Sequence, residues 1–366
     1  MNTNKFESCS FKGQIQEMVR AAEALRFDPK EPVDVSFEEM VQGKLNMSLD
    51  AFYNELGVDP KLDTVQNLLN INDLDVRWII PEIYREALML GYRDAPIWPN
   101  VIAAEENTVG LSQIIPYMNM SDAAPRKVGE GETIPLGAIS YGQKKFSIYK
   151  VGRGISLTYE VMQYASLNVV KLFLADFGLK MGHAFDTLAI DCLINGDQAD
   201  GSESAPVIGV TTPNSKAYKD FLRIWIRMAR IGRKPGILLG GEAAALSTLD
   251  LTEFKTPVQG APQHTLTLKT PVPTGASYFI HGNVPNNQEI ILDPAKAMIK
   301  FNAQPMKVES ERIVSNQTEA FYATLTSGFA RMFRDSAIIM DSSLNVASYG
   351  FPTYMDLDPY QLVDIL

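Results

Sequence analysis

Histidine carries out proton transfer and metal binding near neutral pH, and the chain has three histidines, His183, His264 and His281. His183 is followed three residues later by Asp186, so the two side chains share one face if this segment is a helix. Three histidines are too few for a histidine-rich metal site, and a catalytic triad would have to use one of them. We therefore interpret His183 and Asp186 as a helix-face pair without chemistry.

Two further patterns resemble known motifs but lack the context that those motifs need. Ser147 and Lys150 have the Ser-x-x-Lys spacing of some acylating hydrolases, which place both residues on one side of a helix. Here the segment reads as a strand, in which residues three apart point to opposite faces. The glycine pairs at 129 and 131 and at 152 and 154 are not followed by the helix or third glycine of a dinucleotide-binding turn.

Clustered acidic residues also fail to form a recognisable site. The loop 197–201 lacks the alternating ligands and the final glutamate of an EF-hand. Glu105-Glu106 and the pair Glu130 and Glu132 have no neighbouring feature that would separate the pKa values of two catalytic carboxylates. The sequence therefore predicts no catalytic, cofactor-binding or metal-binding residue, and no enzyme.

The composition is that of an ordinary folded protein with an acidic balance. Hydrophobic residues make up 46% of the chain, and the formal net charge is -10. This charge disfavours a broad basic face that grips phosphates, so we expect at most weak contact with nucleic acid. The two cysteines, Cys9 and Cys192, are far apart, which suits a reducing cytoplasm without disulfides. No apolar run approaches the ~18 residues of a membrane span, so we expect neither secretion nor membrane insertion.

The strongest secondary-structure signal is a long helix over about 167–195, which would position the pair His183 and Asp186. Ser166 is a plausible N-cap, and Asn195-Gly196 is a plausible end. Apolar residues recur at intervals of three and four, which predicts one buried stripe. Its expected members are Val170, Leu174, Phe177, Met181, Ala184, Leu188 and Cys192.

The segments before this helix are less regular. Residues 14–26 have helical spacing, and we interpret 1–75 as a loosely packed extension. Residues 76–110 are interrupted by prolines and predict one short helix with extended chain. Their apolar load is covered either by a partner or by the chain's own core, and it comprises Trp78, Ile79, Ile80, Ile97 and Trp98. Residues 111–154 predict a projecting hairpin, with Lys144 to Val151 as the clearer strand.

The segments after the long helix predict a mixture of helices and strands. Helices are expected at about 216–230 and in EAAALSTL, and strands in GILLGG and at 277–281, 289–292 and 297–301. Two longer extended runs follow up to Met340, and a loose polar tail is expected from Ser342.

This order of elements resembles the HK97-fold major capsid protein of tailed bacteriophages. GEGETIPLGAISYGQKKFSIYKVGRGISLTYEVM resembles its extended loop (E-loop), and SLNVVKLFLADFGLKMGHAFDTLAIDCLINGDQADGSESAPVIGV resembles its spine helix and trailing loop. RKPGILLGGEAAALSTL resembles its axial (A) domain, and FARMFRDSAIIM resembles its last strand pair. The likeness covers about 76–341, and the first 75 residues have no match.

The resemblance implies an α+β, HK97-like capsid fold with an N-terminal arm, an E-loop hairpin, a peripheral (P) domain with a long spine helix, and an A domain. The implied divisions are 1–75 as N-terminal extension, 76–110 as arm, 111–154 as E-loop, 155–212 as P domain, 213–295 as A domain, 296–341 as returning P-domain strands with the final A-domain strand, and 342–366 as C-terminal tail.

The function that the resemblance implies is structural. The chain would assemble with itself into hexamers and pentamers of an icosahedral virion shell around double-stranded DNA, in the bacterial host cytoplasm, without a membrane or a cofactor. Portal and scaffolding or decoration proteins would be its other partners. An encapsulin-like shell around an enzyme cargo is the alternative, and neighbouring genes would separate the two. An enzyme of unknown class is disfavoured by the failure of every catalytic motif.

Some relatives join an E-loop lysine to an asparagine of a neighbour, but the expected hairpin tip, Thr133 to Ser140, has no lysine. Lys127, Lys144 and Lys145 lie nearer its base. We therefore expect a shell without covalent cross-links.

Overall fold

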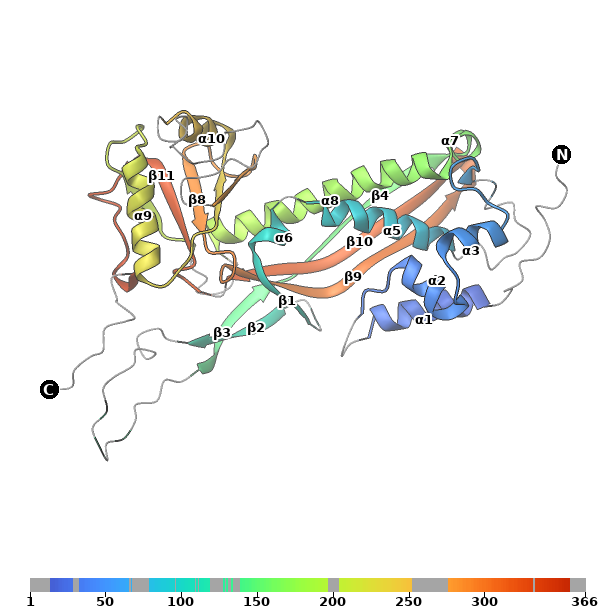
Figure 1. The fold of residues 1–366 in the computed structure, drawn as a ribbon, viewed down its shortest axis with the longest axis horizontal. Helices are drawn as coiled ribbons and strands as arrows, with labels where there is room; N and C mark the ends of the chain where they lie inside the picture. The colour runs from blue at the N-terminus through green and yellow to red at the C-terminus, as the bar shows by residue number, and fades with distance from the viewer. Residues whose placement is uncertain are drawn as a thin grey trace.

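The long axis of the molecule follows one helix and two strands that run side by side for most of its length (Figure 1). These elements are α8 (Leu167–Asn195), β9 (Met298–Ile313) and β10 (Thr318–Arg331). The computed structural model describes residues 14–28, 33–65, 67, 79–95, 97–108, 110, 112–118, 128, 130, 133, 139–196, 204–251, 276–331 and 333–355, and within 112–118 and 139–147 it describes the backbone alone.

A sheet with the strand order β1-β9-β10-β4 lies beneath α8 and forms the body of the molecule. β1 (Ile102–Asn107) is parallel to β9, and β10 is antiparallel to both β9 and β4 (Tyr149–Thr158). In β10, Phe321 and Ala323 are buried, whereas Tyr322 between them is exposed. This alternation places one face of the sheet against the helices, where Tyr84 stacks edge-on against Phe321 with ring centres 4.4 Å apart.

Helices α5 (Ile79–Arg93) and α8 approach each other backbone to backbone. A Cβ atom added at Gly91 of α5 would lie 1.8 Å from the carbonyl oxygen of Ala175. A Cβ atom at Gly178 of α8 would lie 2.0 Å from the carbonyl oxygen of Leu88. Because real Cβ atoms do not come so close to a carbonyl, only glycine fits at these two positions.

The long helix has the predicted limits, but the predicted buried stripe is partly wrong. Phe177, Ala184 and Leu188 are only half-buried, and the buried face continues instead through Gly178 and Phe185. The spacing of apolar residues could not locate this face, because two of its positions are Gly178 and Gly182, which pack against α5 without an apolar side chain.

The N-terminal helices are part of the main core, so the predicted loose packing of 1–75 is wrong for the described residues. These helices are α1 (Gln14–Arg26), α2 (Phe37–Leu45) and α3 (Leu49–Glu55), and Ser36 and Glu39 form a capping box at the start of α2. Ile15, Phe37 and Phe52 are fully or almost fully buried and belong to the same cluster as α5 and α8. Residues 1–13, including Cys9, lie outside the described residues.

A buried ion pair fixes α1 to α5. Arg26 Nη1 donates to both carboxylate oxygens of Glu82, at 2.8 and 2.7 Å, and Arg26 Nη2 donates to the carbonyl oxygen of Val35 at 2.7 Å. The two charged side chains are only 2% and 8% exposed. Next to this pair, Arg85 of α5 donates to Asp34 and to the carbonyl oxygen of Met306 in β9. The extension, the helix and the sheet therefore share one charged junction.

The chain's own core covers the apolar residues of 76–110, so of the two explanations the partner is not needed. Ile79, Ile80, Ile97 and Trp98 are all buried in the main core, while Trp78 lies outside the described residues. The helix here is longer than expected because Pro81 falls in the first turn of α5, where a missing N–H leaves no helical hydrogen bond unmade. Short helix α6 (Trp98–Val101) then leads into β1.

A second sheet, with the order β5-β11-β8-β6-β7, closes the other end of the molecule. Its strands and helices are β5 (Val207–Val210), α9 (Tyr218–Arg230), β6 (Ile237–Gly240), α10 (Glu242–Leu249), β7 (Ser277–Ile280), β8 (Gln288–Leu292) and β11 (Ala337–Asn345). Ile237 and Leu239 face the main core, whereas Leu238 faces a separate core with α9. Because successive side chains of a strand point to opposite faces, β6 packs against the body on one face and against α9 on the other.

The C-terminal segment is ordered further than predicted. β11 continues to Asn345, and Met355 is fully buried in the core beneath α9. Arg227 lies over the ring of Phe351, 4.6 Å from its centre, and donates to the carbonyl oxygen of Met355 at 3.3 Å. The loose tail predicted from Ser342 is therefore wrong up to Met355, and residues 356–366 lie outside the described residues.

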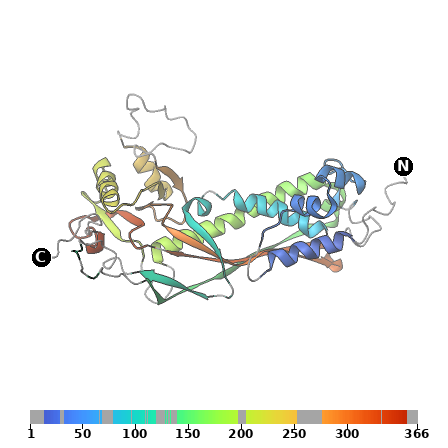
Figure 2. The same cartoon turned by 60° about the horizontal axis from the view of Figure 1, so that its bottom comes forward.

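A two-stranded hairpin leaves the body between β1 and β4 (Figures 1 and 2). It pairs β2 (Ser112–Met118) with β3 (Ile139–Ser147) in antiparallel register. The predicted projecting hairpin is present, but its first strand lies before the Gly-rich segment and β4 belongs to the body sheet. Of the expected tip, Ile139 and Ser140 belong to β3, where they pair with Met118 and Tyr117.

The α+β class predicted from the sequence is confirmed, and the elements follow the order expected of an HK97-like capsid fold. Within the described part of the chain, no helix combines the length and apolar character needed to cross a bilayer.

We predict that Gly178→Ala lowers the free energy of unfolding by at least about 3 kcal/mol, because the added methyl group would press on a carbonyl of α5. The matched control is Gly43→Ala in α2, where nothing lies within 4 Å of the new atom. There the same change should stabilise by up to about 1 kcal/mol. Urea unfolding of the unassembled subunit measures both, and equal effects would contradict the close helix contact.

We also predict that Glu82→Leu destabilises the subunit by about 3–5 kcal/mol, because it leaves the buried charge of Arg26 without its carboxylate. The double variant Arg26→Met, Glu82→Leu should recover most of that loss. Urea unfolding of both variants completes the comparison. A double variant no more stable than Glu82→Leu alone would show that the cost comes from packing.

Candidate assembly surfaces and pocket

One end of the molecule carries a group of exposed apolar side chains, which we call the end patch. It is formed by α7 (Tyr159–Tyr164), the first two turns of α8 and the turn between β9 and β10. Leu172 and Phe173 are each 70% exposed. The patch comprises Val161, Tyr164, Val169, Leu172, Phe173 and Val314. Contiguous exposed apolar surface of this kind is typical of protein interfaces.

The local structure holds this end rigid. Thr158 caps α7 with its hydroxyl oxygen, which accepts from Val161 N at 3.4 Å. Arg312 of β9 donates to the hydroxyl of Tyr159 at 2.7 Å, and Tyr159 N donates to the carbonyl oxygen of Gln317 at 3.0 Å. The patch is therefore presented on a fixed scaffold, which lowers the entropy lost on association.

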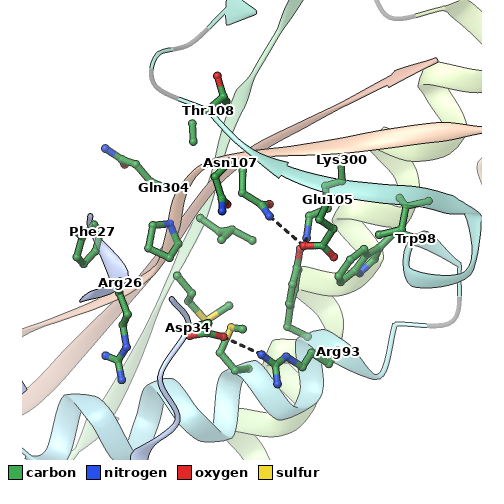
Figure 3. Close-up of a pocket in the computed structure, with 18 of the residues that line it drawn as sticks. Arg26, Phe27, Asp34, Arg93, Trp98, Glu105, Asn107, Thr108, Lys300 and Gln304 are labelled. Carbon is green, nitrogen blue, oxygen red and sulfur yellow. Dashed lines mark hydrogen bonds and ion pairs between the residues drawn. The ribbon is translucent and has the colours of Figure 1, made fainter. Parts of the chain in front are cut away.

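A pocket of about 630 Å³ lies between the N-terminal helices, α5 and the strands β1 and β9 (Figure 3). Its apolar wall includes Met89, Tyr92 and Trp98, and its polar wall includes Glu105 and Lys300. The pocket opens beside β1, an edge strand of the body sheet.

The polar wall of the pocket is a connected set of charges. Asn302 Nδ2 donates to Glu105 Oε2 at 3.0 Å, and Lys300 Nζ lies 3.8 Å from the same oxygen. Lys300 Nζ also lies 3.8 Å above the centre of the Trp98 ring. Burial lowers the pKa of Lys300 to about 8, although Glu105 opposes this shift. The arrangement supplies a lysine that titrates at mildly basic pH beside a carboxylate.

Of the acidic residues singled out in the sequence, Glu105 and Glu106 do not form a pair. Glu105 lies at the pocket, whereas Glu106 is exposed on β1. Glu130 is exposed, and Glu132 lies outside the described residues. The partners of Glu105 come from β9, far along the chain, and no local sequence signal could have found them.

The other predicted candidates are separated. Ser147 ends β3 and Lys150 lies in β4, so the Ser-x-x-Lys match spans two strands. Gly152 and Gly154 of β4 allow close approach of β10, because an added Cβ would lie 2.8 Å from Thr324 or Tyr322. Residues outside the described part of the chain are Lys127, Gly129, Gly131, the loop 197–201 up to Gly201, and His264, and for Lys144 and Lys145 only the backbone is described.

His183 and Asp186 do share one face of α8, and the structure adds His281 to them. No local sequence signal could have identified this third residue, because it follows β7, far along the chain from α8.

We predict that the pH dependence of stability changes when Lys300 is replaced by Met. The folded-state pKa lies below the ordinary value, so the unfolded chain binds more protons and stability rises with pH through this window. The advantage of Lys300→Met over wild type should shrink by about 2 kcal/mol between pH 7 and pH 9.5. Urea unfolding at both pH values measures this, with Lys296→Met as the exposed control. A pH-independent difference would contradict the lowered pKa.

Solved structures of shell proteins are similar to this chain in fold. The virus-like particle from Pyrococcus furiosus is 13% identical, with 72% of this chain and 99% of that chain covered and a TM-score of 0.47. The capsid of cyanophage P-SCSP1u is 12% identical, covering 69% and 89%, with a TM-score of 0.48. The SrpI encapsulin complex from Synechococcus elongatus is 12% identical, covering 71% and 92%, with a TM-score of 0.45. No protein-family model matches the chain, and no curated protein matches it in sequence.

Proposed function

We propose that the chain is a self-assembling major capsid protein that forms the icosahedral head shell around the double-stranded DNA of a tailed bacteriophage. Its role is structural and not catalytic. The observation that carries this proposal is the hairpin β2–β3, which leaves the body and, among the described residues, forms a sheet of its own. In this proposal the hairpin is the E-loop, the body with α8 is the P domain, and the five-stranded unit is the A domain.

The hairpin supports the proposal because an isolated pair of strands is marginally stable in water. In the described part of the chain, β2 and β3 form a sheet only with each other. Both are fixed at one end, where Ser112 pairs with Ser147 beside the body. Lying over a neighbouring subunit would supply the missing packing partner.

The end patch supports self-association at a second place. Its apolar side chains lie at the far end of the molecule from the five-stranded unit, so each subunit has contact surfaces at well-separated positions. Separated surfaces are what a closed shell needs, because each subunit must contact several neighbours at once. We propose hexamers and pentamers of this chain as the capsomers, with portal and scaffolding or decoration proteins as further partners.

The charge suits a container for DNA. A net charge of -10 weakens binding to the packaged phosphates, so the inner surface need not grip its content. We place assembly in the host cytoplasm and the product in the virion.

The hairpin can be removed at a defined point. Because Ser112 and Ser147 are register partners, residues 113–146 can be replaced by a four-residue Gly-Ser link without moving β1 or β4. We predict that this deletion leaves the thermal midpoint of the unassembled subunit nearly unchanged but abolishes closed shells. Electron microscopy and a melting curve measure the two effects. Closed shells from the deletion would refute the assembly role, and an unfolded subunit would refute its independence from the core.

The end patch is tested separately by the double variant Leu172→Glu, Phe173→Glu. Both side chains are 70% exposed, so we predict a folded subunit with wild-type helicity. Shell formation should fall at least tenfold in yield, because each contact would bury unpaired like charges. Shells at wild-type yield would exclude the patch from the interface.

Shells purified from the natural source distinguish a phage head from an encapsulin-like container. Packaged double-stranded DNA supports the proposal. A protein cargo without DNA would replace it by the encapsulin-like alternative.

A further inference from the structure

Three potential metal ligands gather where α8 meets the loop after β7. His183 and Asp186 come from one face of α8, and His281 follows the last residue of β7 directly. One ligand atom from each residue can be chosen so that all three lie within 4.8 Å of one another. The two imidazole rings lie 6.3 Å apart between their centres and are half-buried above a fully buried carboxylate.

Asp186 is held in place but has an unsatisfied oxygen. Its Oδ1 accepts from the backbone N–H of Trp98 at 2.7 Å, which fixes the carboxylate orientation. Its Oδ2 is buried and accepts no hydrogen bond within the described part of the chain. His183 Nδ1 lies 3.2 Å from Oδ2 but without the alignment of a hydrogen bond. A cation between this oxygen and the imidazole of His183 would satisfy the buried carboxylate.

We propose that His183, Asp186 and His281 bind one divalent transition-metal ion of the Zn²⁺ type, with water completing a tetrahedral site. Two ligand atoms that each bind zinc at about 2.0–2.1 Å in a tetrahedral site lie about 3.3 Å apart. The 3.2 Å between His183 Nδ1 and Asp186 Oδ2 matches this separation. His281 is only half-buried, and we expect its side chain to rotate on metal binding and close the remaining distance.

Two imidazoles with one carboxylate select the chemical class of the ion. Imidazole nitrogen prefers zinc, copper, nickel or cobalt, whereas magnesium and calcium require oxygen ligands. The half-exposed side of the site leaves room for water as the fourth ligand.

The burial of Asp186 also favours such an ion. Its side chain is fully buried, so a bound cation would offset the cost of burying the carboxylate.

The site is not fully preformed. His281 Nδ1 accepts a hydrogen bond from Asn283 N at 3.2 Å, an exposed contact. Binding through the other ring nitrogen moves the imidazole proton to Nδ1 and gives up this hydrogen bond. We therefore expect moderate affinity, well below that of structural zinc fingers.

Metal binding would join the two sheets of the molecule. Asp186 already fixes the backbone of α6 to α8, and His281 belongs to the five-stranded unit. An ion shared by these residues would stabilise the angle between that unit and the body, whatever the chain assembles into. The inference does not depend on the proposed function, because the isolated full-length subunit tests it.

The test uses full-length protein from which metal has been removed with a chelator. Calorimetry measures the binding of Zn²⁺ in a titration. A second titration uses Co²⁺, whose absorption spectrum reports tetrahedral coordination. We expect one ion per chain and a higher thermal midpoint with metal. His183→Ala and His281→Ala should each weaken binding by roughly tenfold or more. His264→Ala is the matched control for adventitious binding by a histidine and should bind as wild type does.

Folding defects are separated from loss of ligands in two ways. Asp186→Asn keeps an oxygen that can accept from Trp98 N, so it should fold and lose the metal-induced rise in thermal midpoint. Circular dichroism of each metal-free variant checks that its fold matches wild type. The proposal is overturned by wild-type protein that binds no ion in a one-to-one ratio. It is equally overturned by variants that fold and retain wild-type affinity, or by His264→Ala weakening binding as much as His281→Ala does.

Discussion

The architecture depends on the contact between α5 and α8, where Gly91 and Gly178 let two backbones touch. The close approach of the two helices brings their aromatic residues together, and the rings of Tyr92 and Phe185 meet edge to face 5.4 Å apart. It also brings the chain after α5 to the middle of α8, so that Trp98 N can donate to Asp186. The body sheet, the pocket and the three-residue cluster all take their positions from this one contact.

The charged junction extends the same rigid unit to the N-terminal helices. Arg26 and Glu82 are buried as a bidentate pair, and Arg85 spans from Asp34 to the backbone of β9. Removing either partner would leave a buried charge unpaired. Detaching helices α1 to α3 from the body would therefore cost much of the subunit's stability. The described helices α1 to α3 are therefore an integral part of the body.

Sequence alone located elements whose signals are local, and it failed where a distant partner decides. The limits of α8 were predictable from its cap, its end and its long period of apolar residues. Its buried face was not, because α5 selects Gly178, which has no apolar side chain to count. β2 was not singled out in the sequence, because Pro116 cannot donate to a neighbouring strand and weakens the strand pattern. His281 could not be linked to His183 and Asp186 from the sequence, because it follows β7, far along the chain from α8.

The connection of the hairpin links assembly to the body. β2 follows β1 and β3 precedes β4, and these are the two opposite edges of the body sheet. Both edges carry exposed charges, with Glu105 and Glu106 on β1 and Lys150 and Arg153 on β4, which discourages pairing between sheet edges of different subunits. In the proposed shell, ordered association would then rest on the hairpin and the end patch. Each strand of the hairpin continues into a different edge of the body sheet. A neighbour bound to the hairpin would therefore act on both edges at once, and the geometry of one contact would reach across the whole width of the subunit.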